Sequence, residues 1–183
     1  RVSAAIGAAT HRVVRVDLRA VGGSALTDDL PVPRHRGDAE IGAGVPSTYV
    51  PARNTVFLSL GLALAETLDA TRIVIGANAL DYSGYPDCRA PFIEAFERLA
   101  ALATAAETER DVVFRVHAPL LPLSKAEIVR RGIELGAPLH LTLSCYDPVE
   151  TPRGVHGCGA CDSCLLRRRG FEDAGVPDPA VPA

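Results

Sequence analysis

The sequence contains no methionine among its 183 residues. Because translation normally starts at Met, we expect further residues to precede the opening Arg1-Val2-Ser3-Ala4. An excess of charge of either sign is also lacking, since 19 Lys and Arg stand against 22 Asp and Glu and the net charge is −3. This balance predicts neither a nucleic acid nor an anionic lipid surface as a partner.

Long hydrophobic runs are missing as well. The longest apolar stretch, residues 56–65, is interrupted and much shorter than the roughly 20 residues that cross a bilayer. The first residues contain no hydrophobic core of a signal peptide. We therefore expect no membrane segment and a cytoplasmic location, while a leader ahead of Arg1 is left open.

Composition and periodicity predict an α/β domain. Hydrophobic residues make up 48% and charged residues 22% of the chain, as in an average globular protein with a buried core. Helices are expected over residues 2–9, 54–69, around 93–100 and from 125, and strands over residues 12–18, 72–78 and 112–118. Strands that alternate with helices of this length imply a parallel sheet with crossover connections.

Local patterns refine this expectation. Residues 54–69 are apolar nearly all the way round, which predicts a helix buried on most faces, and residues 72–78 predict a buried strand. Ser124 and Glu127 form a capping-box pattern, and Gly136 is placed to end that helix. Residues 20–46 have no period and predict a long loop, and the Pro-rich residues 176–183 predict a frayed tail.

Cysteine spacing is the strongest chemical signal. Cys158, Cys161 and Cys164 form C-x2-C-x2-C, and Cys145 lies upstream with twelve residues between it and Cys158. Four thiolates at this spacing predict a closed, structural zinc site. An iron–sulfur cluster or plain thiols are the alternatives, and a disulfide framework is disfavoured without secretory features. His156, close by, is expected either to replace one of the cysteines as a ligand or, more simply, to be a solvated histidine in a loop.

A second signal directly follows the strand predicted at residues 72–78. The run from Asp81 to Arg89 (DYSGYPDCR) places two carboxylates, two tyrosines and an arginine where ligands bind in open parallel sheets. Such groups recognise the edge and the face of a guanine-like base. A Gly-Pro turn with solvated acids is the alternative interpretation.

Weaker signals concern anions. Arg53 and Asn54 stand at the start of the predicted helix, where backbone N–H groups favour phosphate, although helix caps beside an arginine are common. Lys125 opposes the dipole of its own helix, so it is either a phosphate contact or an exposed lysine. Arg167, Arg168 and Arg169 are expected to form a solvated face beside the cysteines.

Four runs of residues, taken in chain order, resemble the 7-cyano-7-deazaguanine synthase family of queuosine and deazapurine biosynthesis. They are PSTYVPARN (46–54), SGYPDCR (83–89), PL-x-x-LSKAEI ending at Ile128, and Cys145 followed by CGACDSCLLRRRGF (158–171). The resemblance implies a Rossmann-like parallel sheet of the adenine nucleotide α-hydrolase type, the PP-loop ATP pyrophosphatases, with a C-terminal zinc element. The expected domains are residues 1–140 for nucleotide binding, 141–175 for zinc, and 176–183 as a tail.

The resemblance also implies an activity. Members of the family use ATP and Mg²⁺ to convert 7-carboxy-7-deazaguanine and ammonia into the 7-cyano base, hold one structural zinc ion, and are often homodimers. By this resemblance, the expected catalytic residues are Lys125 and Asp87, and the expected nucleotide contacts are Arg53 and Asn54. The expected substrate contacts are Asp81, Ser83, Tyr85, Cys88 and Arg89. The expected zinc ligands are Cys145, Cys158, Cys161 and Cys164. For Cys88, a buried structural thiol is the alternative.

One part of the family pattern is missing from the 183 residues. The Ser-Gly-Gly-x-Asp-Ser phosphate loop does not occur, and Gly22-Gly23-Ser24 has the reverse order. We expect this loop to precede Arg1. Two other functions remain open: a related ATP pyrophosphatase with another carboxylate or amide substrate, and a zinc-stabilised binding module without turnover.

Overall fold

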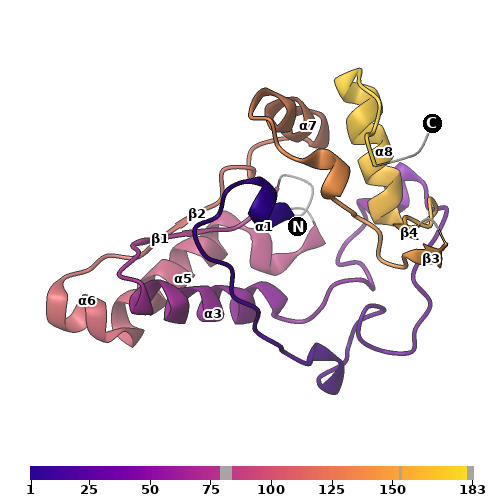
Figure 1. The fold of residues 1–183 in the computed structure, drawn as a ribbon. Helices are drawn as coiled ribbons and strands as arrows, with labels where there is room; N and C mark the ends of the chain where they lie inside the picture. The colour runs from indigo at the N-terminus through magenta and orange to yellow at the C-terminus, as the bar shows by residue number, and fades with distance from the viewer. Residues whose placement is uncertain (79–83, 153, 181–183) are drawn as a thin grey trace. The chain divides into compact units, whose positions relative to one another are not determined.

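The computed structural model describes residues 1–78, 84–152 and 154–180 (Figure 1). The α-helices are α1 (Val2–Ala5), α2 (Asp38–Ile41), α3 (Arg53–Thr67), α5 (Ala90–Ala103), α6 (Ala105–Arg110), α7 (Lys125–Glu134) and α8 (Asp162–Ala174). The strands are β1 (Arg72–Val74), β2 (Arg115–His117), β3 (Val149–Thr151) and β4 (Gly154–His156), and the 3-10 turns are η1 (Leu18–Ala20), η2 (Pro86–Cys88) and η3 (Leu139–Leu141).

The chain divides into two compact units. The first comprises residues 1–43, 47–50 and 123–183, and the second comprises residues 44–46 and 51–122. The division predicted at residue 140 falls within the first unit, so that separation of a nucleotide-binding from a zinc-binding part stays a prediction.

A parallel strand pair organises the second unit. Strands β1 and β2 align Ile73 with Val116, and α5 and α6 form the crossover that two parallel strands require. Helical spacing brings Leu58 and Leu62 of α3 onto the same core as Phe96 of α5 and Phe114. The α/β alternation and the parallel pairing predicted from the sequence are therefore confirmed.

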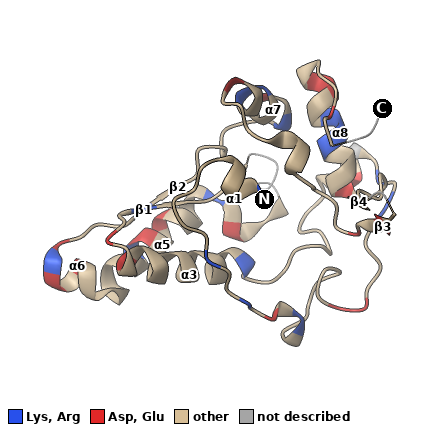
Figure 2. Ribbon diagram, in the orientation of Figure 1, with Lys and Arg blue, Asp and Glu red and all other residues tan. Residues whose placement is uncertain are grey.

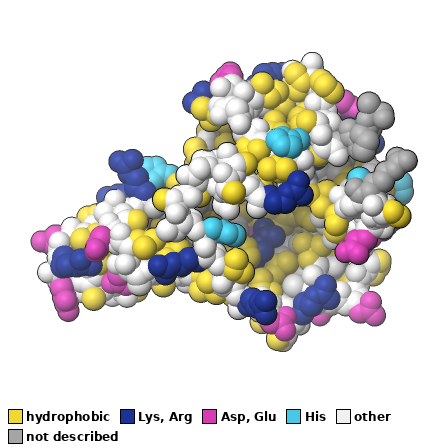
Figure 3. Space-filling view, viewed as in Figure 1, with side chains coloured by type: hydrophobic (Ala, Val, Ile, Leu, Met, Phe, Trp, Pro, Cys, Tyr) yellow, Lys and Arg dark blue, Asp and Glu magenta, His cyan; other side chains and the backbone are white. Residues whose placement is uncertain are grey.

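Burial in this unit is less complete than the sequence pattern predicts. Phe57 on α3 is 50% exposed and Val74 on β1 is 71% exposed, and hydrophobic side chains gather at the molecular surface (Figure 3). The expectations of a helix buried on most faces and of a fully buried strand are thus wrong. The reason is that α3 packs only one of its apolar faces, and that among the described residues β1 pairs with β2 alone.

The strand predicted at residues 12–18 is also wrong. Apart from Leu18, which opens η1, these residues have no regular structure, and Val13 and Val14 are strongly exposed. A β-branched run becomes a strand only when another strand pairs with it, and within the described part of the chain none pairs here. The helix predicted at residues 2–9 is shorter than expected and ends at Ala5.

Helices α7 and α8 pack side by side in the first unit, and both contain acidic and basic residues (Figures 1 and 2). The start of α7 is the predicted capping box: the Ser124 hydroxyl accepts from the Glu127 N–H at 3.3 Å, and the Glu127 carboxylate accepts from the Ser124 N–H at 2.7 Å. Gly136 follows the helix with φ +65°, as its predicted C-terminal signal requires.

Two small elements complete the first unit. The antiparallel hairpin β3–β4 aligns Val149 with His156 and leads into the cysteine-rich loop before α8. Within the described residues, every helix is too short or too polar to cross a membrane.

Candidate functional site

The four cysteines singled out by their spacing form one cluster in the first unit. Their sulfur atoms all lie within 4.8 Å of one another, and the sulfurs of Cys145 and Cys161 are 3.9 Å apart. Cys145 follows η3, Cys158 lies between β4 and α8, Cys161 is the N-cap of α8, and Cys164 lies in its first turn. Residues separated by up to nineteen positions are thus brought to one point.

Backbone N–H groups point at these sulfurs. The N–H of Cys158 donates to the Cys145 sulfur at 3.2 Å, and the N–H of Asp147 donates to the same atom at 3.3 Å. The N–H of Cys161 donates to the Cys158 sulfur at 3.4 Å. Such donors stabilise negative charge on sulfur, and a metal-binding cysteine carries that charge.

The thiols differ in their pKa. Burial alone would raise the pKa of Cys158, but the N–H groups of Ala160 and Cys161 and the neighbouring thiols outweigh it and lower the pKa to about 7. Burial raises the pKa of both Cys145 and Cys164. One thiolate is therefore available near neutral pH, and the other ligands lose their protons as a cation binds.

The geometry fits a tetrahedral metal ion. Four sulfurs about 2.3 Å from a central ion lie roughly 3.8 Å from one another. The 3.9 Å between Cys145 and Cys161 matches this spacing, and all five cysteines of the chain are free thiols. Four sulfur ligands leave no open coordination position for water or substrate, so the cluster is suited to a structural ion.

Two glycines beside the cluster disfavour larger residues for different reasons. A Cβ atom at Gly157 would lie 3.2 Å from the Cys164 sulfur, whereas Gly159 has open space around it but a left-handed φ of +73°. His156, considered above as a substitute ligand, ends β4 and lines a neighbouring cavity instead. Among the described residues, only the four cysteines form a group with the geometry of a metal site.

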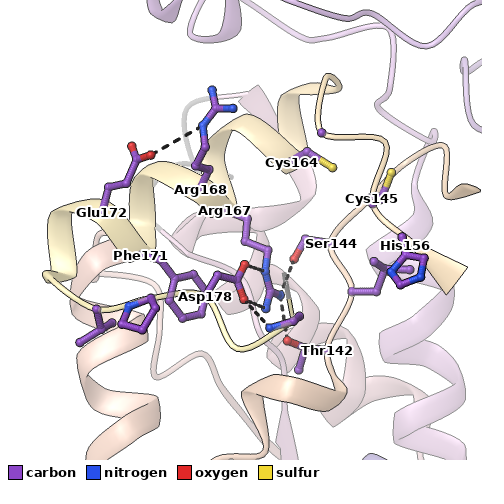
Figure 4. A pocket seen from close by; sticks show the side chains of 16 residues that line it. Thr142, Ser144, Cys145, His156, Cys164, Arg167, Arg168, Phe171, Glu172 and Asp178 are labelled. Carbon is purple, nitrogen blue, oxygen red and sulfur yellow. Dashed lines mark hydrogen bonds and ion pairs between the residues drawn. The ribbon is translucent and has the colours of Figure 1, made fainter. Parts of the chain in front are cut away.

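A cavity of about 550 Å³ lies beside the cluster, between the start of α8, the segment after η3 and the C-terminal residues (Figure 4). Its wall contains Arg167, whose guanidinium donates to the Asp178 carboxylate at 2.7 Å and to the Thr142 hydroxyl at 2.8 Å. The same guanidinium lies 5.1 Å from the centre of the Phe171 ring.

These contacts correct two expectations. Arg167 is largely buried and paired rather than solvated, whereas Arg168 is exposed and pairs loosely with Glu172 at 3.8 Å. The tail is tied down through Asp178, whose carboxylate also accepts the Ala180 N–H at 3.0 Å. The prediction of fraying from residue 176 is therefore wrong up to residue 180, because a buried ion pair holds this segment to α8.

In the second unit, Asp87 and Asn54 meet at the start of α3. The Asp87 carboxylate, 7% exposed, accepts the Asn54 N–H at 2.9 Å. The Asn54 side-chain amide donates to the Asp87 carbonyl at 3.1 Å and to the Cys88 sulfur at 3.0 Å. Asp87 therefore occupies one of the helix-start N–H groups that the sequence assigned to phosphate.

The other predicted residues of this unit lie nearby or outside the described residues. Arg53 is the first residue of α3, Tyr85 precedes η2, and Arg89 is the exposed N-cap of α5. Asp81 and Ser83 lie outside the described residues. The substrate and nucleotide roles of all these residues stay predictions.

Lys125, the only lysine in the 183 residues, is the first residue of α7 in the first unit. It is half-buried against α8, where a Cβ atom at Gly170 would lie 2.9 Å from the Lys125 Cβ and 3.4 Å from its carbonyl carbon. A glycine at this position of α8 lets the two helices approach closely, so that Lys125, at the start of α7, lies directly against α8.

Three ion pairs around the cysteine cluster and the neighbouring cavity were not predicted from the sequence. Arg36 pairs with Asp162, Arg34 pairs with Asp147, and Arg167 pairs with Asp178. Arg34 and Arg36 lie more than a hundred residues before their partners, so no local pattern indicates these pairs.

Gly157→Ala is expected to weaken metal binding about 10-fold, since the ligand sulfur of Cys164 cannot retreat from the added methyl group without leaving the ion. Competition with a chromophoric chelator measures the affinity. Gly76→Ala is the matched control, because its Cβ meets nothing within 4 Å. Equal affinities for the two variants would contradict the tight packing at Gly157.

Asp178→Asn is expected to lower the free energy of unfolding by about 2 kcal/mol at pH 7, because Arg167 loses its ionised partner. Burial alone would raise the pKa of Asp178, but the Arg167 guanidinium and the Ala180 N–H lower it below its ordinary value. The stabilisation is therefore complete above the unfolded pKa near 4 and is lost as pH falls through the lower folded pKa.

Urea unfolding of wild type and Asp178→Asn from pH 7 down to pH 3 tests this difference. Metal loss in acid affects both proteins and cancels in the comparison. Glu172→Gln removes the exposed pair with Arg168 and should change stability little at any pH. A difference for Asp178→Asn that stays constant down to pH 3 would refute the ionic contribution.

Comparison with known proteins agrees with the sequence resemblance. The family described as queuosine biosynthesis protein QueC matches residues 1–175. The 7-cyano-7-deazaguanine synthase of Anaeromyxobacter sp. (strain Fw109-5) is 60% identical over 182 residues, which cover 99% of this chain and 76% of the relative. The synthase of Myxococcus xanthus (strain DK1622) is 58% identical over 98% of this chain and 76% of the relative. The synthase of Syntrophotalea carbinolica (strain DSM 2380 / NBRC 103641 / GraBd1) is 59% identical over 96% of this chain and 74% of the relative. The chain therefore belongs to the queuosine biosynthesis protein QueC family.

Proposed function

We propose that the protein converts 7-carboxy-7-deazaguanine and ammonia into 7-cyano-7-deazaguanine with the consumption of ATP. The observation that carries this proposal is about 60% identity, over nearly the whole chain, to relatives named 7-cyano-7-deazaguanine synthase. The parallel strand pair belongs, in this proposal, to a Rossmann-like sheet of the adenine nucleotide α-hydrolase type. We expect the enzyme to act in the cytoplasm as a homodimer.

The chemistry requires two activations. A carboxylate is a poor electrophile until its oxygen becomes part of a leaving group, and transfer of an adenylyl group from ATP, with release of pyrophosphate, achieves this. Ammonia then displaces AMP and forms the amide. A second adenylyl transfer onto the amide oxygen lets AMP leave and two protons depart, which yields the nitrile.

Cations beside the phosphates of ATP lower the energy of the adenylyl-transfer step electrostatically. Lys125 and Arg53 are the proposed cations, with Mg²⁺ as the expected metal partner of ATP. Each stabilises the negative charge that builds on the phosphates during adenylyl transfer. Asn54 is the neighbouring candidate for a nucleotide contact.

Recognition of the base falls to the polar residues that follow β1. Carboxylates such as Asp81 and Asp87 accept hydrogen bonds from the N–H edge of a guanine-like base, and the Tyr85 ring can cover its face. Ser83, Cys88 and Arg89 complete the proposed substrate contacts. The polar contacts of Asp87 with Asn54 support this proposal, because they fix the position of the Asp87 carboxylate.

Zinc is the ion we assign to the cysteine cluster. Four thiolates in a tetrahedral arrangement are its usual structural ligand set, and it has no redox chemistry to add to the reaction. Its binding would contribute on the order of 10 kcal/mol to ordering loops that have little core of their own.

The direct test incubates the complete gene product with 7-carboxy-7-deazaguanine, ammonium, ATP and Mg²⁺, and identifies products by mass spectrometry. The proposal predicts the nitrile base together with AMP and pyrophosphate. Turnover of other carboxylates but not this one would replace the proposal with a related ligase. Bound zinc without any turnover would replace it with a binding module.

Lys125→Ala is expected to lower kcat about 100-fold, because one cation facing the phosphates is lost. Amine-reactive labelling gives a second measurement. ATP should protect Lys125, the single lysine among the 183 residues, from acylation. Arg131→Ala on the same helix is the control, because Arg131 makes an exposed ion pair with Glu134 and has no proposed role in catalysis or binding. Unprotected Lys125 with unchanged kcat would remove it from the site.

Asp87→Asn separates a substrate role from a structural one. The amide oxygen can still accept the Asn54 N–H, so stability should change little, whereas loss of the carboxylate charge should lower nitrile formation at least 100-fold. Asp87→Ala removes the acceptor and should also destabilise the second unit. Full activity of Asp87→Asn would leave Asp87 a structural cap of α3 alone.

A further inference from the structure

A short segment far from the cysteines in sequence lies against the cysteine-rich loop of the first unit. Residues 34–36, named the strap here, contact this loop through a single antiparallel β-bridge between Arg34 and Cys161. The His35 N–H donates to the Ala160 carbonyl at 2.9 Å. The strap is therefore paired by its backbone with the stretch that carries one of the four cysteine ligands.

Side chains reinforce this pairing. The Arg36 guanidinium binds both oxygens of Asp162, with the Nε–Oδ1 distance at 3.1 Å and a second contact from Nη2. The Asp162 side chain is only 7% exposed and lies between Cys161 and Cys164. A bidentate, largely buried pair of this kind holds a defined geometry. The pair of Arg34 with Asp147 is exposed and adds little.

The strap belongs to a segment with little regular structure. Residues 21–50 contain only the one-turn helix α2 as regular structure. The base of this segment is closed where the Ala25 N–H donates to the Ser47 carbonyl at 2.8 Å, beside the buried Ser24 and Thr48. Between these points the strap is the contact that ties the segment to the cysteine-rich loop.

That contact depends on an ordered loop between β4 and α8. Gly157 and Gly159 give this loop high conformational entropy when it is unfolded, so the loop needs an external source of order. A metal ion on the four cysteines provides that order, and removal of the ion would free the Ala160 and Cys161 backbone groups that pair with the strap.

We propose that Arg36 is a positioning residue through which the metal centre holds residues 21–43 in place. The inference rests on the proposed metal site and extends it: the ion orders residues 21–43 as well as its own loop. Because coupling between two sites is reciprocal in binding free energy, the strap must also strengthen metal binding.

Hydrogen exchange with mass spectrometry on the complete gene product tests the first half. Peptides that cover the strap should exchange at least 10-fold faster after a chelator removes the metal, whereas peptides from the core of α3 should not change. Equal exchange of the strap in the loaded and the stripped protein would overturn the proposal.

Competition for the metal with a chromophoric chelator at equilibrium tests the second half. Arg36→Gln should still bind one metal per chain, but with an affinity about 10-fold lower than that of wild type. Arg36→Lys keeps the charge without the two parallel bonds and should fall between them. Arg131→Gln, an exposed arginine on α7, should behave like wild type.

The outcomes separate this inference from the metal site itself. A metal affinity of Arg36→Gln equal to that of wild type, with one metal bound per chain, would overturn the coupling and leave the metal site intact. Four free thiols and no metal in protein purified without a chelator would overturn both.

Discussion

Mutual repulsion among four cysteine thiolates is the constraint on which the first unit depends. Sulfurs within 4.8 Å of one another can all be ionised only when a cation lies between them, and a cation also fixes the loops that carry them. Helix α8 begins at this cluster and presents Gly170 to the first residue of α7. A metal ion held by this cluster would fix the start of α8, which packs against the first residue of α7, Lys125.

The second unit is stabilised differently. Its core consists of apolar side chains from α3, α5 and the segment around β2, and it contains no comparable cluster of metal ligands among the described residues. The polar contacts of Asn54 with Asp87 and Cys88 join η2 to the start of α3. A carboxylate held this rigidly is suited to recognition, because little side-chain entropy remains to be lost when a ligand binds.

Patterns that act over short sequence distances could be predicted. The Ser124–Glu127 capping box, the α/β alternation and the C-x2-C-x2-C ligand spacing depend on neighbouring residues, and the structure confirms them. Burial could not be predicted as well, because the exposure of Phe57 and Val74 depends on which elements pack against them. The ion pairs of Arg36 with Asp162 and of Arg167 with Asp178 had no sequence signal, since arginine and aspartate are ordinary surface residues until the fold brings them together.

In the proposed metal site, the four cysteines hold one zinc ion as a closed structural centre. X-ray absorption spectroscopy of the protein purified without added metal tests this site most directly. We expect absorption at the zinc edge and four sulfur neighbours at about 2.3 Å. Iron absorption with a short iron–iron distance, or oxygen and nitrogen neighbours in place of sulfur, would contradict it.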